Sequence, residues 1–175
     1  MLVLYKGARG RGKTLTMIKD GLNYKYKGWK VYSNMENQKI AEYISNEDIL
    51  SIDKESDLKN CVLIIDEIQT LFDSRRSMKK ENLNFSYFIQ QIRKRNIILL
   101  CTTQYTNTVD LRLRQHIDIL ALPRHHNDLH VCVVNYIDMT SIEDVEFGIT
   151  EPKSVEIVYN AKPIYELYNT QEMIV

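Results

Sequence analysis

The sequence is poor in the residues that mark linkers, disulfide frameworks and metal sites. Its 175 residues include three prolines and six glycines, which leaves little room for flexible connections between domains. The three cysteines form no pair with metal-ligand spacing, and each lies in an apolar run, so we expect buried free thiols at Cys61, Cys101 and Cys132. No internal repeat is present, and we expect residues 1–175 to form a single domain.

The chain also lacks long hydrophobic runs and an excess of either charge. No run approaches the roughly 18 apolar residues that a membrane-spanning helix needs, and the stretch 1–6 is too short for a signal peptide. We therefore expect a location in the host cytoplasm or in a virion. Lys plus Arg and Asp plus Glu both total 23, whereas a monomeric nucleic-acid-binding protein is typically basic. Binding of DNA would need a local basic patch or a ring of subunits.

Apolar runs predict strands that alternate with helical segments along the first two thirds of the chain. The run 61–65 is continuously apolar, which is typical of a strand that is covered on both faces in a parallel sheet. Alternation of strands and helices predicts an α/β domain with a mostly parallel sheet. The expected strands are 2–6, 30–34, 61–65, 97–101 and 117–122, and the expected helical segments are 14–27, about 85–92 and about 110–115.

The pattern changes after residue 127. Residues 129–138 and 154–159 predict longer strands joined by an acidic turn, and 161–169 predicts a short closing helix. The highly charged stretch 73–84 is expected to be a loop. The expected fold is therefore an α/β core with a β-rich C-terminal extension.

A phosphate-binding loop follows the first expected strand. The motif G-x-x-x-x-G-K-[ST] is matched at every fixed position and opens an amphipathic helix, as its chemistry requires. Glycines allow backbone N–H groups to surround phosphate oxygens, and the N-terminus of the helix favours the same negative charge. The lysine can reach the β- and γ-phosphates, and the threonine hydroxyl can hold Mg²⁺. The residues are Gly7, Ala8, Arg9, Gly10, Arg11, Gly12, Lys13 and Thr14.

Polar residues end the next two apolar strands. Asp66 and Glu67 follow the run 61–65 and are expected at the sheet edge where ligands bind in α/β folds. Asp66 would hold Mg²⁺ directly or through water, and Glu67 would orient and polarise an attacking water. Gln104, after Thr102 and Thr103, would contact the γ-phosphate or that water. No Asn-Lys-x-Asp motif is present, which favours ATP over GTP.

Together these elements resemble the FtsK/HerA superfamily of DNA-pumping ATPases. The resemblance covers most of the chain and is closest to small viral genome-packaging ATPases and to Zot-like assembly ATPases of filamentous phages. It implies a RecA-like P-loop core, a hexameric ring and double-stranded DNA as the moved partner, with a viral capsid or membrane protein as a further partner. It also implies that each site receives an arginine from its neighbour, and Arg93 and Arg95 match that position.

Four functions remain open on the sequence alone. The first is an ATP-driven translocase that packages a viral genome, and the second is a Zot-like ATPase that acts in phage extrusion. Zot-like ATPases normally carry a membrane-spanning segment, and its absence from this sequence favours the first. The third is a small P-loop kinase, although a kinase needs neither Glu67 nor Gln104. The fourth is a nucleotide-gated binding protein with little turnover.

Two further clusters of charged or ionisable residues leave alternative roles open. The basic residues that follow the acidic pair could line a DNA channel or simply face solvent. A metal site is conceivable where His125, His126 and His130 gather beside Asp128, but no firm spacing supports it and a surface loop is favoured. The candidate channel residues are Arg75, Arg76, Lys79 and Lys80.

Overall fold

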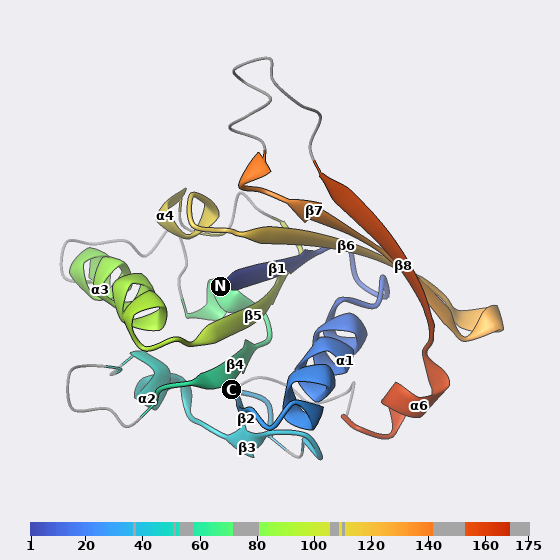
Figure 1. Cartoon of the computed structure of the whole chain (residues 1–175), viewed down its shortest axis with the longest axis horizontal. Helices are drawn as coiled ribbons and strands as arrows, with labels where there is room; N and C mark the ends of the chain where they lie inside the picture. Colours follow the sequence, from blue (N-terminus) through green and yellow to red (C-terminus); the bar gives the residue numbers. More distant parts are fainter. Residues whose placement is uncertain are drawn as a thin grey trace.

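One mixed sheet runs through the whole computed structural model (Figure 1). The structure describes residues 1–36, 38–50, 52, 58–71, 81–105, 109, 111–141 and 153–168, with the side chains of residues 81–86 and 112 left aside. The sheet has eight strands in the order β3-β2-β4-β5-β1-β6-β7-β8. The strands are β1 (Leu2–Lys6), β2 (Lys30–Ser33), β3 (Glu42–Tyr43), β4 (Cys61–Ile65), β5 (Ile98–Thr103), β6 (Ile119–His126), β7 (Val131–Asp138) and β8 (Ser154–Asn160).

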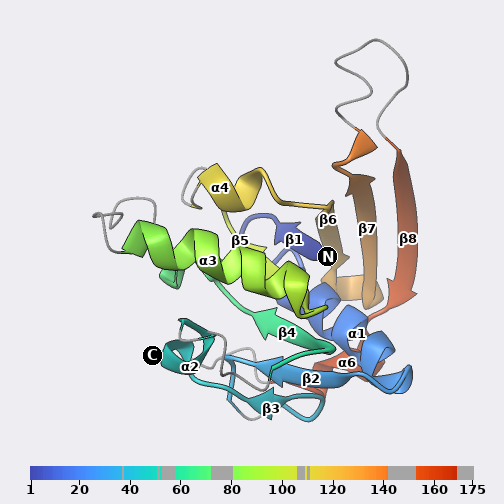
Figure 2. The same ribbon diagram turned by 60° about the vertical axis from the view of Figure 1, so that its left-hand side comes forward.

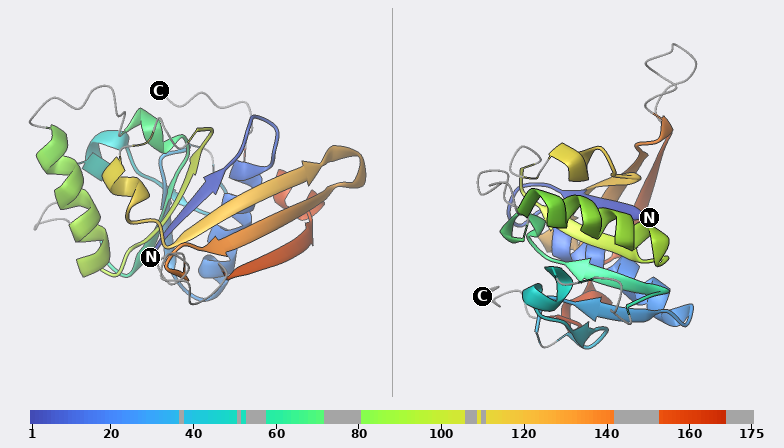
Figure 3. Two further views of the ribbon diagram at one scale, coloured as in Figure 1. Left: turned by 90° about the horizontal axis from the view of Figure 1, so that it is seen from above. Right: turned by 90° about the vertical axis from the view of Figure 1, so that its left-hand side faces the viewer.

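The strands from β3 to β6 pair in parallel, and β6, β7 and β8 form an antiparallel meander. The order places β5 between β1, which leads into the phosphate-binding loop, and β4, which ends before Asp66. β5 is therefore an extra strand between the strand of the phosphate-binding loop and the strand of the acidic pair. The carboxyl ends of β1, β4 and β5 therefore meet at one edge of the sheet (Figure 3, left).

Helices cover both faces of the parallel part of the sheet (Figure 2). Successive residues of a strand point to opposite faces, so Leu2 and Leu4 pack with side chains of α3, whereas Val3 and Tyr5 pack with those of α1. Burial on both sides explains the continuous apolar runs. The helices are α1 (Lys13–Tyr26), α2 (Asn46–Leu50), α3 (Glu81–Lys94), α4 (Leu111–Arg114) and α6 (Lys162–Tyr165), with short 3-10 turns η1 (Ile68–Thr70) and η3 (Asn127–Leu129).

The meander is attached to α1 by buried hydroxyl groups. Tyr5 and Tyr136 both donate to Oδ2 of Asp20, at 2.7 and 2.8 Å. One helical turn closer to the phosphate-binding loop, the hydroxyls of Thr16 and Tyr159 lie 3.0 Å apart. Because these residues come from β1, α1, β7 and β8, the polar contacts fix the extension against the helix that carries the loop.

The structure corrects several boundaries. The first turn of α3 occupies residues 81–84, which were predicted as loop because their polar composition hides the helical pattern. Strand β6 continues to His126, beyond the predicted end at 122, because its whole length pairs with β7. The closing helix α6 is confined to four residues. Among the described residues, no helix combines the length and hydrophobicity needed to cross a bilayer.

We predict that the contacts of Asp20 contribute to folding. Replacement Asp20→Ala leaves the hydroxyl of fully buried Tyr5 without its acceptor, which should lower the free energy of unfolding by about 1–3 kcal/mol. The matched control Asp128→Ala, at an exposed position in η3, should change it by no more than about 0.5 kcal/mol. Urea denaturation measures both values, and equal effects would contradict a special role for Asp20.

Candidate active site

The backbone of the phosphate-binding loop has the conformation that its glycines permit. Gly10 and Gly12 have φ angles of 74° and 84°, in the left-handed region that side chains disfavour. A Cβ atom on Gly12 would also lie 3.0 Å from Cβ of His125 and 3.2 Å from Sγ of Cys132. Glycine is thus required at position 12 by both its backbone angle and the close approach of β6 and β7. The loop leads directly into α1, whose first N–H groups are suited to an anion.

Lys13 begins α1 and points into the loop. Only 7% of Lys13 is exposed, and its Nζ donates to the carbonyl of Ala8 at 3.2 Å. Burial lowers the pKa of Lys13 and the charge of Arg9 acts in the same direction, while the carboxylates of Glu67 and Asp66 oppose the shift. A cationic group beside a glycine-rich loop at a helix N-terminus is suited to the phosphates of a nucleotide.

Asp66 is held by groups from three other elements. Thr14 Oγ1 and Thr102 Oγ1 both donate to Asp66 Oδ1, at 3.2 and 2.5 Å. The backbone N–H of Asp66 donates to Oδ1 of Asn34 at 2.9 Å. The two predicted Mg²⁺-holding residues, Thr14 and Asp66, are therefore in direct contact. Asn34 and the bridging role of Thr102 are absent from the sequence prediction.

The surroundings of Asp66 fit a divalent cation. Burial raises the pKa of its carboxyl, the hydrogen bonds from Thr102 and Thr14 and the charge of Lys13 lower it, and the charge of Glu67 raises it. A cation would offset the cost of burying this charge. Within the described ranges, no group of three or more His, Cys, Asp or Glu side chains is placed to hold a metal. Mg²⁺ typically takes one or two protein carboxylates and keeps water or phosphate oxygens as its other ligands.

Glu67 lies beside Asp66 and in contact with the predicted sensing residue. Its backbone N–H donates to Thr102 Oγ1 at 2.8 Å, and Gln104 Nε2 donates to Glu67 Oε1 at 3.2 Å. Glu67 has a φ angle of 52°, which is uncommon for a residue other than glycine and is often found at functional sites. The structure therefore brings Glu67 and Gln104 together.

Strand register explains why these side chains meet. Ile65 pairs with Cys101 in the parallel ladder of β4 and β5, so the next residues along each strand, Asp66 and Thr102, lie side by side. Ser33 pairs with Ile64, which places Asn34 at the same edge. The signal for Asn34 is a polar residue at the end of an expected strand, but only the strand order indicates that β2 adjoins β4.

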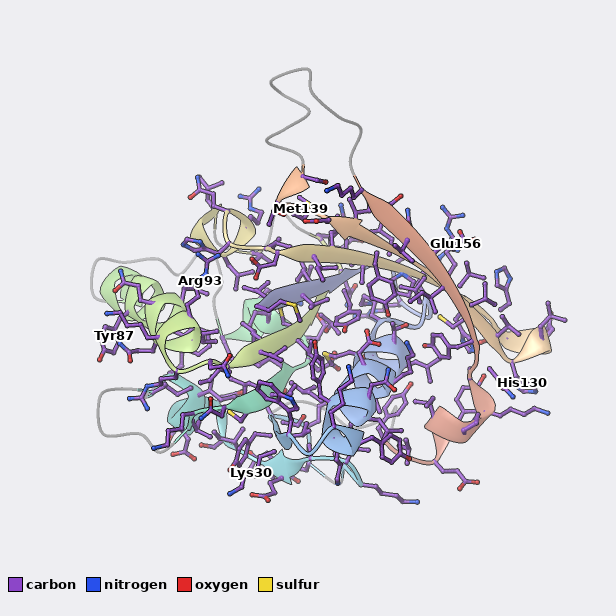
Figure 4. All side chains as sticks on the ribbon, in the orientation of Figure 1. Lys30, Tyr87, Arg93, His130, Met139 and Glu156 are labelled. Atoms are coloured by element: carbon purple, nitrogen blue, oxygen red, sulfur yellow. The ribbon has the colours of Figure 1, made fainter. Side chains whose placement is uncertain are left out.

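The two predicted arginines lie elsewhere. Arg93 and Arg95 precede β5, whereas Gln104 follows it, so the length of a six-residue strand, about 20 Å, separates them from the site. Arg93 Nη2 is 3.7 Å from Asp118 Oδ1, and Arg95 Nε donates to Gln91 Oε1 at 3.2 Å. Figure 4 shows Arg93 between α3 and α4, away from the phosphate-binding loop. Neither arginine therefore reaches the candidate active site of its own chain. Supply of an arginine by a neighbouring subunit stays a prediction.

The predicted histidine loop is only partly a loop. His125 and His126 end β6, and His130 lies beyond η3 at the tip of the meander (Figure 4). The hydroxyl of Tyr165 lies 2.8 Å from His125 Nε2 and 3.4 Å from His130 Nδ1. These contacts join α6 to the strands beside the phosphate-binding loop. The candidate channel residues Arg75, Arg76, Lys79 and Lys80 lie outside the described residues.

Comparisons with known proteins agree with this arrangement. Residues 1–172 match the profile of the family described as zonular occludens toxin (Zot). The N-terminal domain of zonular occludens toxin from Neisseria meningitidis is similar in structure, with a TM-score of 0.67 and 20% identity over 96% of this chain and 98% of that one. No curated protein matches the sequence.

Two other solved structures share the fold at lower similarity. The genome-packaging NTPase B204 of Sulfolobus turreted icosahedral virus 2, solved with ATP-gammaS, has a TM-score of 0.56 and 15% identity over 87% of this chain and 95% of that one. The flagellar accessory protein FlaH of Methanocaldococcus jannaschii has a TM-score of 0.52 and 14% identity over 79% of this chain and 77% of that one. The predicted fold class, an α/β RecA-like P-loop core with a mostly parallel sheet, is confirmed.

We predict that the hydroxyl of Thr102 sets the geometry of both acidic residues. Thr102→Val keeps the shape but removes the bridge between Asp66 and Glu67, and should lower the ATP hydrolysis rate by about 10²-fold, the effect of misplacing a catalytic group by about 1 Å. The control Thr103→Val alters the neighbouring buried hydroxyl, which donates to the carbonyl of Tyr105, and should change the rate less than about threefold. Similar losses in both variants would argue against the bridge.

Proposed function

The chain belongs to the zonular occludens toxin (Zot) family, and we propose that it is an ATP-hydrolysing motor subunit that moves DNA during phage or virus assembly. The observation that carries the proposal is the meeting of the phosphate-binding loop, Asp66, Glu67 and Gln104 at one edge of the sheet. These groups would bind the phosphates, hold Mg²⁺ and orient a water for hydrolysis of a nucleoside triphosphate.

Binding of ATP would be divided between backbone and side chains. The N–H groups of residues 7–14 and the N-terminus of α1 would surround the phosphates, with Lys13 adding positive charge. Thr14 and Asp66 would hold Mg²⁺, which supplies further charge for the phosphates when it is bound. The genome-packaging NTPase B204, a protein of the same fold, was solved with ATP-gammaS, which supports nucleotide binding by this fold.

Hydrolysis would depend on Glu67. Its carboxylate lies next to the metal-holding Asp66 and is oriented by Gln104 Nε2, so it is placed to accept a hydrogen bond from a water in line with the γ-phosphate. Gln104 would respond to the γ-phosphate through the same contact. A small-molecule kinase uses a second substrate hydroxyl instead of water, and a carboxylate–amide pair such as Glu67–Gln104 favours hydrolysis.

The match to the Zot family favours a Zot-like role in phage assembly over the genome packaging that the sequence prediction ranked first. Genome packaging is the second candidate, because a packaging NTPase has the same fold. Both roles require force on DNA. With zero formal net charge, a single subunit has no overall attraction for DNA, so we expect a ring, such as a hexamer, to gather local basic residues.

The position of the arginines fits a ring. Arg93 and Arg95 lie at the sheet edge opposite their own nucleotide site, where they cannot contact its phosphates but can face a neighbouring subunit. An arginine at a subunit interface would make the hydrolysis rate depend on ring assembly, because its guanidinium stabilises the charge that spreads over the transferred phosphoryl group.

The first test compares ATP hydrolysis with and without double-stranded DNA. We expect DNA to raise the rate at low salt, with little sequence preference, and added salt to remove this stimulation because the contacts are made to phosphates.

Glu67→Gln should bind ATP but hydrolyse it about 10²–10⁴-fold more slowly. Neutralising Arg75, Arg76, Lys79 and Lys80 together tests whether they carry the stimulation. Hydrolysis indifferent to DNA under ring-forming conditions would reject the motor.

The second test asks whether an arginine acts between subunits. If Arg93 or Arg95 is the arginine that enters the neighbouring site, its replacement by Ala should lower the hydrolysis rate on the order of 10³-fold or more. Mixing the inactive variant with Glu67→Gln should restore part of the activity, because some interfaces then combine an intact Glu67 with an intact arginine. Absence of rescue at every mixing ratio, for both arginines, would indicate a self-sufficient site in each subunit.

A further inference from the structure

The carboxylate of Glu67 is held by a second amide besides that of Gln104. Gln69 Nε2 donates to Glu67 Oε2, while Gln104 Nε2 donates to Glu67 Oε1 at 3.2 Å. Each oxygen of the carboxylate therefore has its own amide donor, one from η1 and one from the end of β5. Two donors on two different elements fix the plane of the carboxylate more firmly than one donor would.

The other half of the Gln69 amide has an unused acceptor. Among the described residues, Gln69 Oε1 is one of few buried side-chain atoms without a hydrogen-bond partner. Buried carbonyl oxygens are normally paired, so an unpaired one beside a candidate catalytic carboxylate indicates a place for a donor such as water. A water has two hydrogens, and it can donate one to Glu67 and the other to Gln69 Oε1.

The backbone holds Gln69 in a fixed relation to Glu67. Glu67 precedes η1 with a left-handed backbone, and its carbonyl accepts from Thr70 N at 2.8 Å. Ile68 between them is fully buried and anchors the turn in the core below α3. Glu67 and Gln69 consequently lie on a short, well-anchored turn rather than on a free loop, which suits groups that must hold a reacting water in place.

We propose that Gln69 is a positioning residue for ATP hydrolysis, which orients Glu67 through Nε2 and accepts a hydrogen bond from the attacking water through Oε1. The proposal rests on the proposed ATPase function. In the step, the water oxygen bonds to the γ-phosphorus and its proton passes to Glu67. The bond between that phosphorus and the β–γ bridging oxygen breaks, and ADP leaves with the electron pair.

The first experiment compares Gln69→Leu with Thr70→Val, a matched change at the exposed neighbouring position of the same turn. Leucine removes donor and acceptor while filling a similar volume. We expect Gln69→Leu to lower the single-turnover hydrolysis rate by about 10²-fold, the cost of a misplaced reacting group, with the affinity for ATP within about twofold of wild type. Thr70→Val should leave both quantities within about twofold. A rate loss under threefold in Gln69→Leu, or an equal loss in Thr70→Val, overturns the proposal.

The second experiment separates positioning from a general structural effect. If Gln69 and Glu67 act together on one water, adding Gln69→Leu to Glu67→Ala should cause clearly less further loss than Gln69→Leu causes in the wild type, whereas independent effects would multiply. Full multiplication of the two losses, or loss of ATP affinity along with rate, overturns the positioning role. Wild-type protein that binds ATP without turnover refutes the ATPase function and this role together, while active wild type with active Gln69→Leu refutes this role alone.

Discussion

The active-site edge depends on one hydroxyl group that joins two parallel strands. Thr102 Oγ1 donates to the carboxylate of Asp66 and accepts from the backbone N–H of Glu67, so the acidic residues after β4 are placed by the end of β5. In a parallel ladder the register fixes which residues lie beside one another at the carboxyl edge, and a shift of one residue would turn Thr102 to the opposite face. The candidate Mg²⁺ ligand and the candidate water-orienting residue therefore share one support.

The antiparallel meander supports the opposite side of the phosphate-binding loop. His125, Cys132 and Tyr159 are successive cross-strand neighbours in β6, β7 and β8, and this row faces the start of α1. Thr16, whose hydroxyl bonds to the carbonyl of Gly12, also contacts both Cys132 and Tyr159. The β-rich extension therefore supports the candidate nucleotide site, because it packs against Gly12 and Thr16.

The groups of the proposed ATPase lie at two opposite edges of the sheet. The carboxyl edge gathers the phosphate-binding loop, Asp66, Glu67 and Gln104, while Arg93 and Arg95 lie at the amino edge of the same strands. A rigid sheet covered on both faces keeps these groups apart within a subunit. Repetition around a ring can bring the amino edge of one subunit to the carboxyl edge of the next, which is a simple way to make turnover depend on assembly.

Local patterns of residues predict the α/β class, most strands, and the phosphate-binding loop with Asp66, Glu67 and Gln104. The start of α3 and the full length of β6 were not predicted, because polar residues at a helix N-terminus and at the end of a strand have the composition of loops. The contacts of Asn34, Thr102 and Gln69 with the acidic pair become visible only in the folded chain. Their roles follow from strand order, register and a left-handed turn at Glu67, and these arise from pairing between segments that are distant in the chain.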